Sequence, residues 1–79
     1  MNIEMYTWTT CPFCVRAKAL LHKRGLDFEE HVMDGDFEGL VEIKRRIGHP
    51  TVPIILIDGE LIGGYQELAA LDARGALVR

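Results

Sequence analysis

Two cysteines, Cys11 and Cys14, are the residues of this 79-residue chain whose type and spacing most clearly predict chemistry. Pro12 and Phe13 separate them, a short strand-like run precedes them, and a segment of helical periodicity follows. Cys11 is therefore predicted to lie at a helix N-cap, where unpaired amides and the positive end of the helix dipole favour a thiolate. The thiolate is the nucleophile of disulfide exchange, and Cys14 is one turn away, where it could resolve a mixed disulfide on Cys11.

Other uses of a cysteine pair fit this sequence less well. Structural zinc needs four ligands, and the chain has neither a second Cys-x-x-Cys motif nor a spaced histidine pair. Covalent haem attachment needs a histidine directly after the second cysteine, where this chain has Val15. A structural disulfide across so short a gap would constrain the unfolded chain very little. We therefore expect no metal site at the cysteines.

Two further segments could form a binding site with the cysteines. Pro53 opens a predicted strand, and a cis bond after Val52 would turn the backbone groups of Val52 toward the cysteines, where an extended peptide could pair with them. A trans proline at a strand edge is the alternative. Gly63 and Gly64 precede a predicted helix whose first amides could bind a carboxylate, and a simple turn is the alternative there.

The rest of the sequence predicts the elements that position these groups, in the order βαβαββα. Strands are expected over residues 3–7, 27–32, 53–57 and 60–62, and helices over residues 12–24, 37–47 and 65–74. Gly25 and Gly48 are expected to end the first two helices. The strands at 3–7 and 27–32 should form a parallel pair joined by a right-handed crossover. Asp58-Gly59 should form the turn of a hairpin that adds two antiparallel strands to the same sheet.

Composition limits the class of protein. Apolar residues make up 48% and charged residues 27% of the chain, which is typical of a folded globular domain, and residues 1–79 are expected to form one domain. The net charge of −3 gives no general attraction for nucleic acid or anionic membranes, and the longest apolar run, 52–57, is too short to span a membrane. The first residues resemble no secretory leader, so the cytoplasm is the expected location, with neither nucleic acid nor membrane as a partner.

Three motifs together make the chain resemble the small dithiol glutaredoxins of bacteria over nearly its whole length. They are Cys11-Pro12-Phe13-Cys14, Thr51-Val52-Pro53 and the run Gly-Gly-Tyr-Gln-Glu-Leu at 63–68. The resemblance implies a thioredoxin-like fold, with a four-stranded mixed sheet flanked by three helices. It also implies a glutathione-dependent thiol–disulfide oxidoreductase that reduces protein disulfides and glutathione mixed disulfides. Glutathione would be a co-substrate, no cofactor would be bound permanently, and the chain is expected to act as a monomer.

The resemblance also implies the residues of the site. Cys11 and Cys14 would be catalytic, Val52 would pair with the cysteinyl part of glutathione, and a cis proline is implied at Pro53. The residues expected to bind substrate or glutathione are Trp8, Phe13, Thr51, Val52, Pro53, Gly64, Tyr65 and Gln66.

Three positions depart from the family pattern. Trp8 stands where the family commonly has Lys, Gln66 where it often has Asp, and His49 where Arg or Gln is frequent. Charge-assisted hydrogen bonds contribute about twice as much as neutral ones, so these departures predict weaker glutathione binding.

Two other functions remain as alternatives. One is a glutaredoxin-like redoxin that is reduced by thioredoxin reductase and donates electrons to ribonucleotide reductase. The other is a carrier in which two chains bridge an iron–sulfur cluster through Cys11 and two glutathiones; Pro12 argues against it, because family members of that kind usually have a smaller, more flexible motif.

Overall fold

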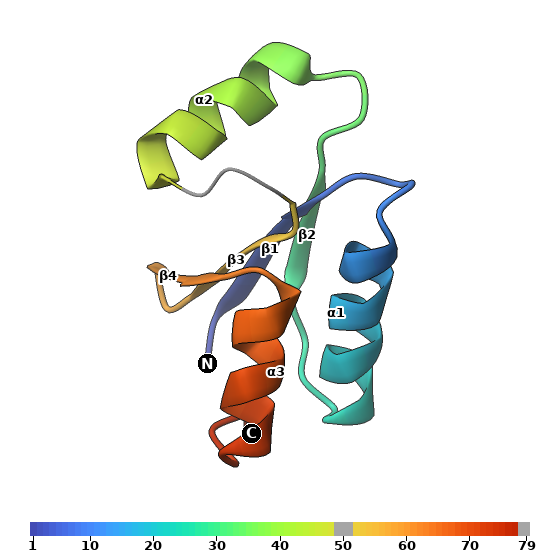
Figure 1. Ribbon diagram of the computed structural model, residues 1–79, viewed down its shortest axis with the longest axis vertical. Coiled ribbons are helices and arrows are strands. Elements are labelled where there is room, and N and C mark those ends of the chain that lie inside the picture. Colours follow the sequence, from blue (N-terminus) through green and yellow to red (C-terminus); the bar gives the residue numbers. More distant parts are fainter. Residues whose placement is uncertain (49–51, 78–79) are drawn as a thin grey trace.

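A four-stranded sheet with the spatial order β2-β1-β3-β4 organises the chain. The structure is a computed structural model, and it describes residues 1–48 and 52–77. Figure 1 shows the sheet with two of the helices on one side of it and the third set apart from them. The elements are β1 (Ile3–Thr7), α1 (Pro12–Lys23), β2 (Glu29–Val32), α2 (Phe37–Ile47), β3 (Ile54–Ile57), β4 (Glu60–Gly63) and α3 (Tyr65–Ala73).

Strand pairing confirms the predicted mixed sheet. β1 is parallel to β2, β3 is antiparallel to β1, and β4 is antiparallel to β3. Asp58 and Gly59 join β3 to β4 with φ angles of 53° and 81°. Positive φ at both central residues is the geometry of the tight turn that suits twisted hairpin strands, and Asp-Gly is among its preferred sequences.

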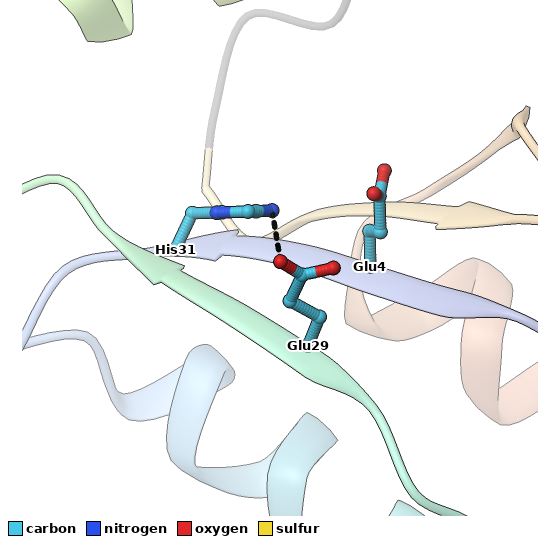
Figure 2. A group of neighbouring side chains, drawn as sticks. All are labelled: Glu4, Glu29 and His31. Carbon is cyan, nitrogen blue, oxygen red and sulfur yellow. Dashed lines mark ion pairs between the residues drawn. The ribbon is translucent and has the colours of Figure 1, made fainter.

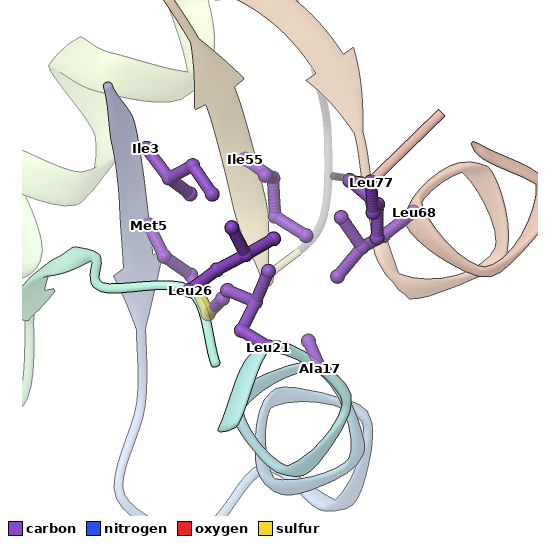
Figure 3. Packing of buried hydrophobic residues seen from close by; sticks show 8 residues of the cluster. All are labelled: Ile3, Met5, Ala17, Leu21, Leu26, Ile55, Leu68 and Leu77. Carbon is purple, nitrogen blue, oxygen red and sulfur yellow. The ribbon is translucent and has the colours of Figure 1, made fainter. Parts of the chain in front are cut away.

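The main core lies between the sheet and the two helices α1 and α3 (Figure 3). Alternate residues of β1 point into it, so Ile3 and Met5 are buried, as are Ala17 and Leu21 on one face of α1. The buried cluster consists of Ile3, Met5, Ala17, Leu21, Leu26, Ile55, Leu68 and Leu77. This packing fixes the direction of α1 and so determines where its N-terminal cysteines lie.

The α2 helix lies beyond the end of the sheet at which β2 finishes (Figure 1). Its bounds match the prediction, but the predicted apolar stripe is only partly covered. Leu40 is buried, whereas Phe37 is 72% and Val41 is 46% exposed. Helical spacing shows that these side chains share one side of the helix, but it does not show how much of that side a neighbour covers.

Most differences from the predicted bounds arise at strand ends. β3 begins at Ile54 and not at Pro53, since proline has no N–H to donate to the ladder. β2 begins at Glu29, two residues later than predicted, while β4 extends to Gly63 and α3 ends at Ala73. In the described part of the chain, no helix has both the length and the apolar character needed to cross a membrane.

Candidate active site

Cys11 is the N-cap residue of α1, as predicted. Its backbone is extended, with φ −121° and ψ 105°, and Pro12 takes the first helical position, where a missing N–H costs nothing. The backbone N–H of Cys14 donates a hydrogen bond to Sγ of Cys11 over 3.1 Å. One unpaired amide of the helix start is therefore aimed at this sulfur, the arrangement that stabilises a negative charge there.

Cys11 and Cys14 are joined as a disulfide, with their Cα atoms 5.1 Å apart. Cys11 is 8% exposed and Cys14 is 0% exposed. A sulfur of an outside molecule can therefore approach Cys11, whereas Cys14 can be reached only from within the motif. The two cysteines therefore differ in their access to an outside molecule.

The backbone of Val52 borders the same sulfur. The Val52-Pro53 peptide bond is cis, and Sγ of Cys11 lies 3.9 Å from the carbonyl oxygen of Val52. The sequence had left cis and trans open, so the structure decides this point. Thr51, also predicted to bind substrate, lies outside the described residues.

A cavity of about 340 Å³ opens beside the cysteine motif. Its aromatic part is formed by Phe13 and Tyr65, whose ring centroids are 6.2 Å apart, and the guanidinium of Arg16 lies 5.2 Å from the centroid of Phe13. The cavity is lined by Phe13, Val52, Pro53, Gly64, Tyr65, Gln66 and Glu67. All but one of these are among the residues predicted from the sequence, and the fold brings them together from α1, the start of β3 and the start of α3.

Glu67 is the lining residue that the prediction missed. Gly64 caps α3, and its N–H donates a hydrogen bond to Oε1 of Glu67 over 2.7 Å. A glutamate three residues after a cap residue is the sequence signal for this bond, and it could have drawn attention to Glu67. At Gly63, where φ is 127°, a Cβ atom would lie 2.6 Å from the same Oε1, so the carboxylate occupies space that only glycine leaves free.

Trp8 does not line this cavity. It is 39% exposed, and Nζ of Lys44 in α2 lies 5.8 Å from the centroid of its ring. The next residue, Thr9, donates its backbone N–H to Oδ1 of Asp34 over 2.8 Å, which ties the loop before Cys11 to the turn before α2. His49, another departure from the family pattern, lies outside the described residues.

A polar network joins α1 to the first two strands. Glu30 accepts hydrogen bonds from Oγ1 of Thr7 over 2.7 Å and from Nζ of Lys18 over 3.0 Å. The Thr7 hydrogen bond, assisted by Lys18, holds the pKa of Glu30 below its ordinary value. Lys18 is therefore engaged with a carboxylate on β2.

In the described part of the chain, one group of side chains could offer ligand atoms to a cation, namely Glu4, Glu29 and His31 (Figure 2). These atoms lie within 4.8 Å of one another, and Nε2 of His31 is 4.0 Å from Oε1 of Glu29. Glu4 and Glu29 are direct partners on the parallel strands β1 and β2, and the neighbouring Met5 points into the core, so the group lies on the opposite face of the sheet. It shares no residue with the cavity beside the cysteines.

Comparison with known proteins decides the family. The family model described as "Glutaredoxin" matches residues 3–62. The chain belongs to the glutaredoxin family. Glutaredoxin 3 of Escherichia coli strain K12 is 51% identical over 76 residues, which cover 96% of this chain and 92% of that protein.

Solved glutaredoxin structures also share the fold. A dithiolic glutaredoxin of Trypanosoma brucei brucei superimposes with a TM-score of 0.82 at 45% identity, covering 95% of this chain and 80% of that one. A buckwheat glutaredoxin–glutathione complex superimposes with a TM-score of 0.86 at 26% identity, covering 95% and 71% of the two chains. This glutaredoxin therefore has the thioredoxin-like fold and is a glutathione-dependent thiol–disulfide oxidoreductase with a redox-active Cys-x-x-Cys motif.

Proposed function

We propose that Cys11 and Cys14 divide the reaction between them, and the difference in their burial is the observation that carries this proposal. With a glutathionylated protein, the Cys11 thiolate attacks the sulfur of glutathione and forms a new S–S bond. The bond to the substrate breaks, and the substrate thiolate leaves and takes up a proton. A second glutathione thiolate then attacks the glutathione bound to Cys11, which releases oxidised glutathione and regenerates the thiolate.

Protein disulfides require both cysteines. Cys11 attacks one sulfur of the substrate, and the other sulfur leaves as a thiol. Cys14, 0% exposed and one turn away on the same helix, then attacks Sγ of Cys11, releases the second substrate thiol and forms the Cys11–Cys14 disulfide. Two glutathiones reduce this disulfide in sequence, each oxidised to one half of a glutathione disulfide.

Glutathione lies, in this proposal, along the cavity beside Cys11. Its cysteinyl part pairs with the backbone of Val52, and its γ-glutamyl carboxylate binds the first amides of α3 at Tyr65 and Gln66. The carboxylate of Glu67 faces the same cavity and carries the charge that suits the γ-glutamyl ammonium. Phe13, Pro53 and Gly64 form the cavity wall, and Trp8, a further contact predicted from the sequence, would lie on the other side of Cys11.

The proposed partners are glutathione, disulfide-containing proteins and glutathionylated proteins, with the chain acting as a monomer. The proposed location is the cytoplasm, where a cysteine pair of this kind is more often catalytic than structural. No permanently bound cofactor takes part, because each step exchanges one disulfide for another.

Single replacement of each cysteine tests the division of roles. Cys11→Ser should abolish the reduction of both a glutathionylated peptide and a protein disulfide, because the attacking sulfur is lost. Cys14→Ser should keep the reduction of the glutathionylated peptide and lose most of the protein disulfide reduction. Equal loss of both activities in the two variants would contradict the proposal, and circular dichroism would show that both variants are folded.

A further inference from the structure

A second cavity, of about 430 Å³, lies between the edge strand β4 and the helix α3. In the described part of the chain β4 pairs with β3 alone, because it is the last strand of the order β2-β1-β3-β4. The free edge of such a strand carries N–H and C=O groups with which an added strand can pair. The cavity therefore lies beside an edge that can accept an extended segment of another chain.

This cavity, called the β4–α3 groove below, is lined by residues 60–62 of β4 and by Glu67, Ala70, Leu71 and the C-cap residue Arg74 on α3. Their spacing on α3 places the charged residues at the two ends of one helix face and the apolar residues between them. Leu61 adds an apolar side chain from β4 that is 37% exposed. An exposed apolar centre with a charged rim is typical of a surface that binds a protein segment.

The β4–α3 groove continues the cavity beside Cys11, because Glu67 lines both. Val52 also lines the cavity beside Cys11, and its carbonyl oxygen lies 3.9 Å from Sγ of Cys11. A chain bonded to Cys11 through its own cysteine can therefore pass Val52, follow the first cavity to Glu67 and enter the groove.

The proposed orientation of glutathione gives the direction of such a chain. The γ-glutamyl group is bonded to the nitrogen of the cysteine residue, as the preceding residue is in a polypeptide. The proposed function places this group at the start of α3, so the residues that precede a substrate cysteine would follow the same course. This course is open when Cys11 attacks a protein disulfide, since the substrate and not glutathione then occupies the first cavity.

We propose that the β4–α3 groove binds the segment that precedes the reactive cysteine of a protein disulfide substrate, as an extended chain with apolar side chains. This assignment rests on the proposed function, because it uses the orientation of glutathione given above. The helix face from Glu67 to Arg74 is about 10 Å long, which matches about three residues of an extended chain. Glutathionylated proteins place glutathione in the first cavity and do not use the groove.

A thiol exchange on Cys11 tests the assignment without enzymatic turnover. Cys14→Ser is first converted to the mixed disulfide of Cys11 with glutathione. A peptide thiolate that attacks Sγ of Cys11 forms a new S–S bond, and glutathione leaves as a thiolate and takes up a proton. Mass spectrometry of the intact protein at equilibrium, with fixed concentrations of both thiols, gives the ratio of the peptide adduct to the glutathione adduct.

Three peptides are compared, each with one cysteine flanked by two glycines on either side, so that the thiols have the same surroundings. The first has the run Val-Thr-Val-Thr before the glycines, the second has Ser-Gly-Ser-Gly there, and the third has Val-Thr-Val-Thr at the other end. Each peptide is measured with Cys14→Ser alone and with Leu61→Ser or Val32→Ser added. Val32 is the matched control, because it is 51% exposed on β2, the other edge strand of the sheet.

The first peptide is expected to give an adduct ratio about fivefold higher than the second, the scale of partial burial of a few apolar side chains. Leu61→Ser should remove most of this gain, and Val32→Ser should keep it. Equal ratios for the first two peptides, or a gain that Leu61→Ser leaves unchanged, would overturn the assignment. The comparison of peptides on Cys14→Ser alone needs no change in the groove.

Further results separate this assignment from the proposed function. If glutathione forms its adduct on Cys11 and the run before the cysteine has no effect, the proposed function stands and only the groove is misassigned. If the run acts only after the cysteine, the proposed orientation of glutathione is wrong, and the assignment is overturned with it. Sedimentation equilibrium examines a second copy of the chain as the occupant, and a dimer that Leu61→Ser dissociates would also overturn the assignment.

Discussion

The backbone N–H of Cys14 donates a hydrogen bond to Sγ of Cys11 over 3.1 Å, at the N-cap of α1. This contact joins the two cysteines through the backbone as well as through their disulfide. In the reduced protein the same amide can stabilise a thiolate at Cys11, because an N–H group at a helix start has no partner within the helix. This hydrogen bond therefore predicts how readily the Cys11 thiol ionises.

Cys11 is expected to ionise more readily than an ordinary cysteine, with a pKa below about 8.5. Ultraviolet absorbance of the thiolate, followed during a pH titration of reduced Cys14→Ser, isolates the Cys11 thiol. Reduced Cys11→Ser is the control, and its buried Cys14 thiol should ionise at higher pH. A Cys11 thiol that titrates like free cysteine would remove the electrostatic basis of the proposed mechanism.

Glu67→Gln is expected to raise the Michaelis constant for glutathione about three- to tenfold, with a smaller effect on the maximal rate. Glutamine keeps an oxygen that can accept the Gly64 N–H, so the replacement removes the charge while sparing the start of α3. Glu38→Gln, outside the lining of the cavity, makes the same change in net charge and should leave the constant unaltered. An equal increase of the Michaelis constant in both variants would show that glutathione binding depends on the net charge of the chain and not on the position of Glu67.

Trp8→Lys is expected to lower the Michaelis constant for glutathione. The change places an ammonium on the loop before Cys11, where it can form a charge-assisted hydrogen bond with the glycyl carboxylate of glutathione. Steady-state reduction of a glutathionylated peptide at varied glutathione concentration measures the constant. An unchanged or higher value would show that the departure at Trp8 does not weaken glutathione binding.

The network around Glu30 predicts a dependence of stability on pH. Its pKa is lowered in the folded chain, first by the hydrogen bond from Thr7 and then by Lys18. A lowered folded-state pKa adds stability that is fully present above the ordinary value of 4.5 and is lost as the pH falls through the folded-state value. Urea unfolding of the wild type should therefore show a decreasing free energy of unfolding as the pH falls below that ordinary value.

Thr7→Val tests the cause of this dependence, because valine has nearly the same shape without the hydroxyl donor. At neutral pH it should lower the free energy of unfolding by about 1 kcal/mol, and it should flatten the decrease at acid pH. Glu30→Gln should flatten the decrease further, since it removes the titrating group. If the free energy of unfolding of Glu30→Gln falls as steeply at acid pH as that of the wild type, other carboxylates cause the decrease.

The choice of reductant separates this protein from thioredoxin-reductase-dependent redoxins. With NADPH, glutathione and glutathione reductase should reduce the Cys11–Cys14 disulfide much faster than thioredoxin reductase alone, because the proposed function places glutathione in the cavity beside Cys11. Consumption of NADPH, measured with each system at equal protein concentration, gives the comparison. Faster reduction by thioredoxin reductase would favour the redoxin alternative. An iron–sulfur carrier, in contrast, would be coloured when it is prepared without oxygen.

Local sequence determined the elements of this fold and the position of the cysteines. The bounds of β1 and α2, the Asp58-Gly59 turn and the placement of Cys11 at a helix start all follow from side-chain periodicity, from positive φ at glycine and from helix capping. Each of these involves residues a few positions apart, and their preferences act within that distance.

Only the tertiary structure decided which side chains meet. Lys44 and Trp8 are in contact but lie in different segments of the chain, and so do the members of the network of Thr7, Lys18 and Glu30. No local sequence pattern predicts either set of contacts. The exposure of Phe37 could not be predicted from the sequence either. Periodicity assigns a residue to a helix face but does not show whether another element covers that face. Contacts between distant segments depend on strand register and helix packing, which the whole core fixes together, and the cavity beside Cys11 exists only after that core has formed.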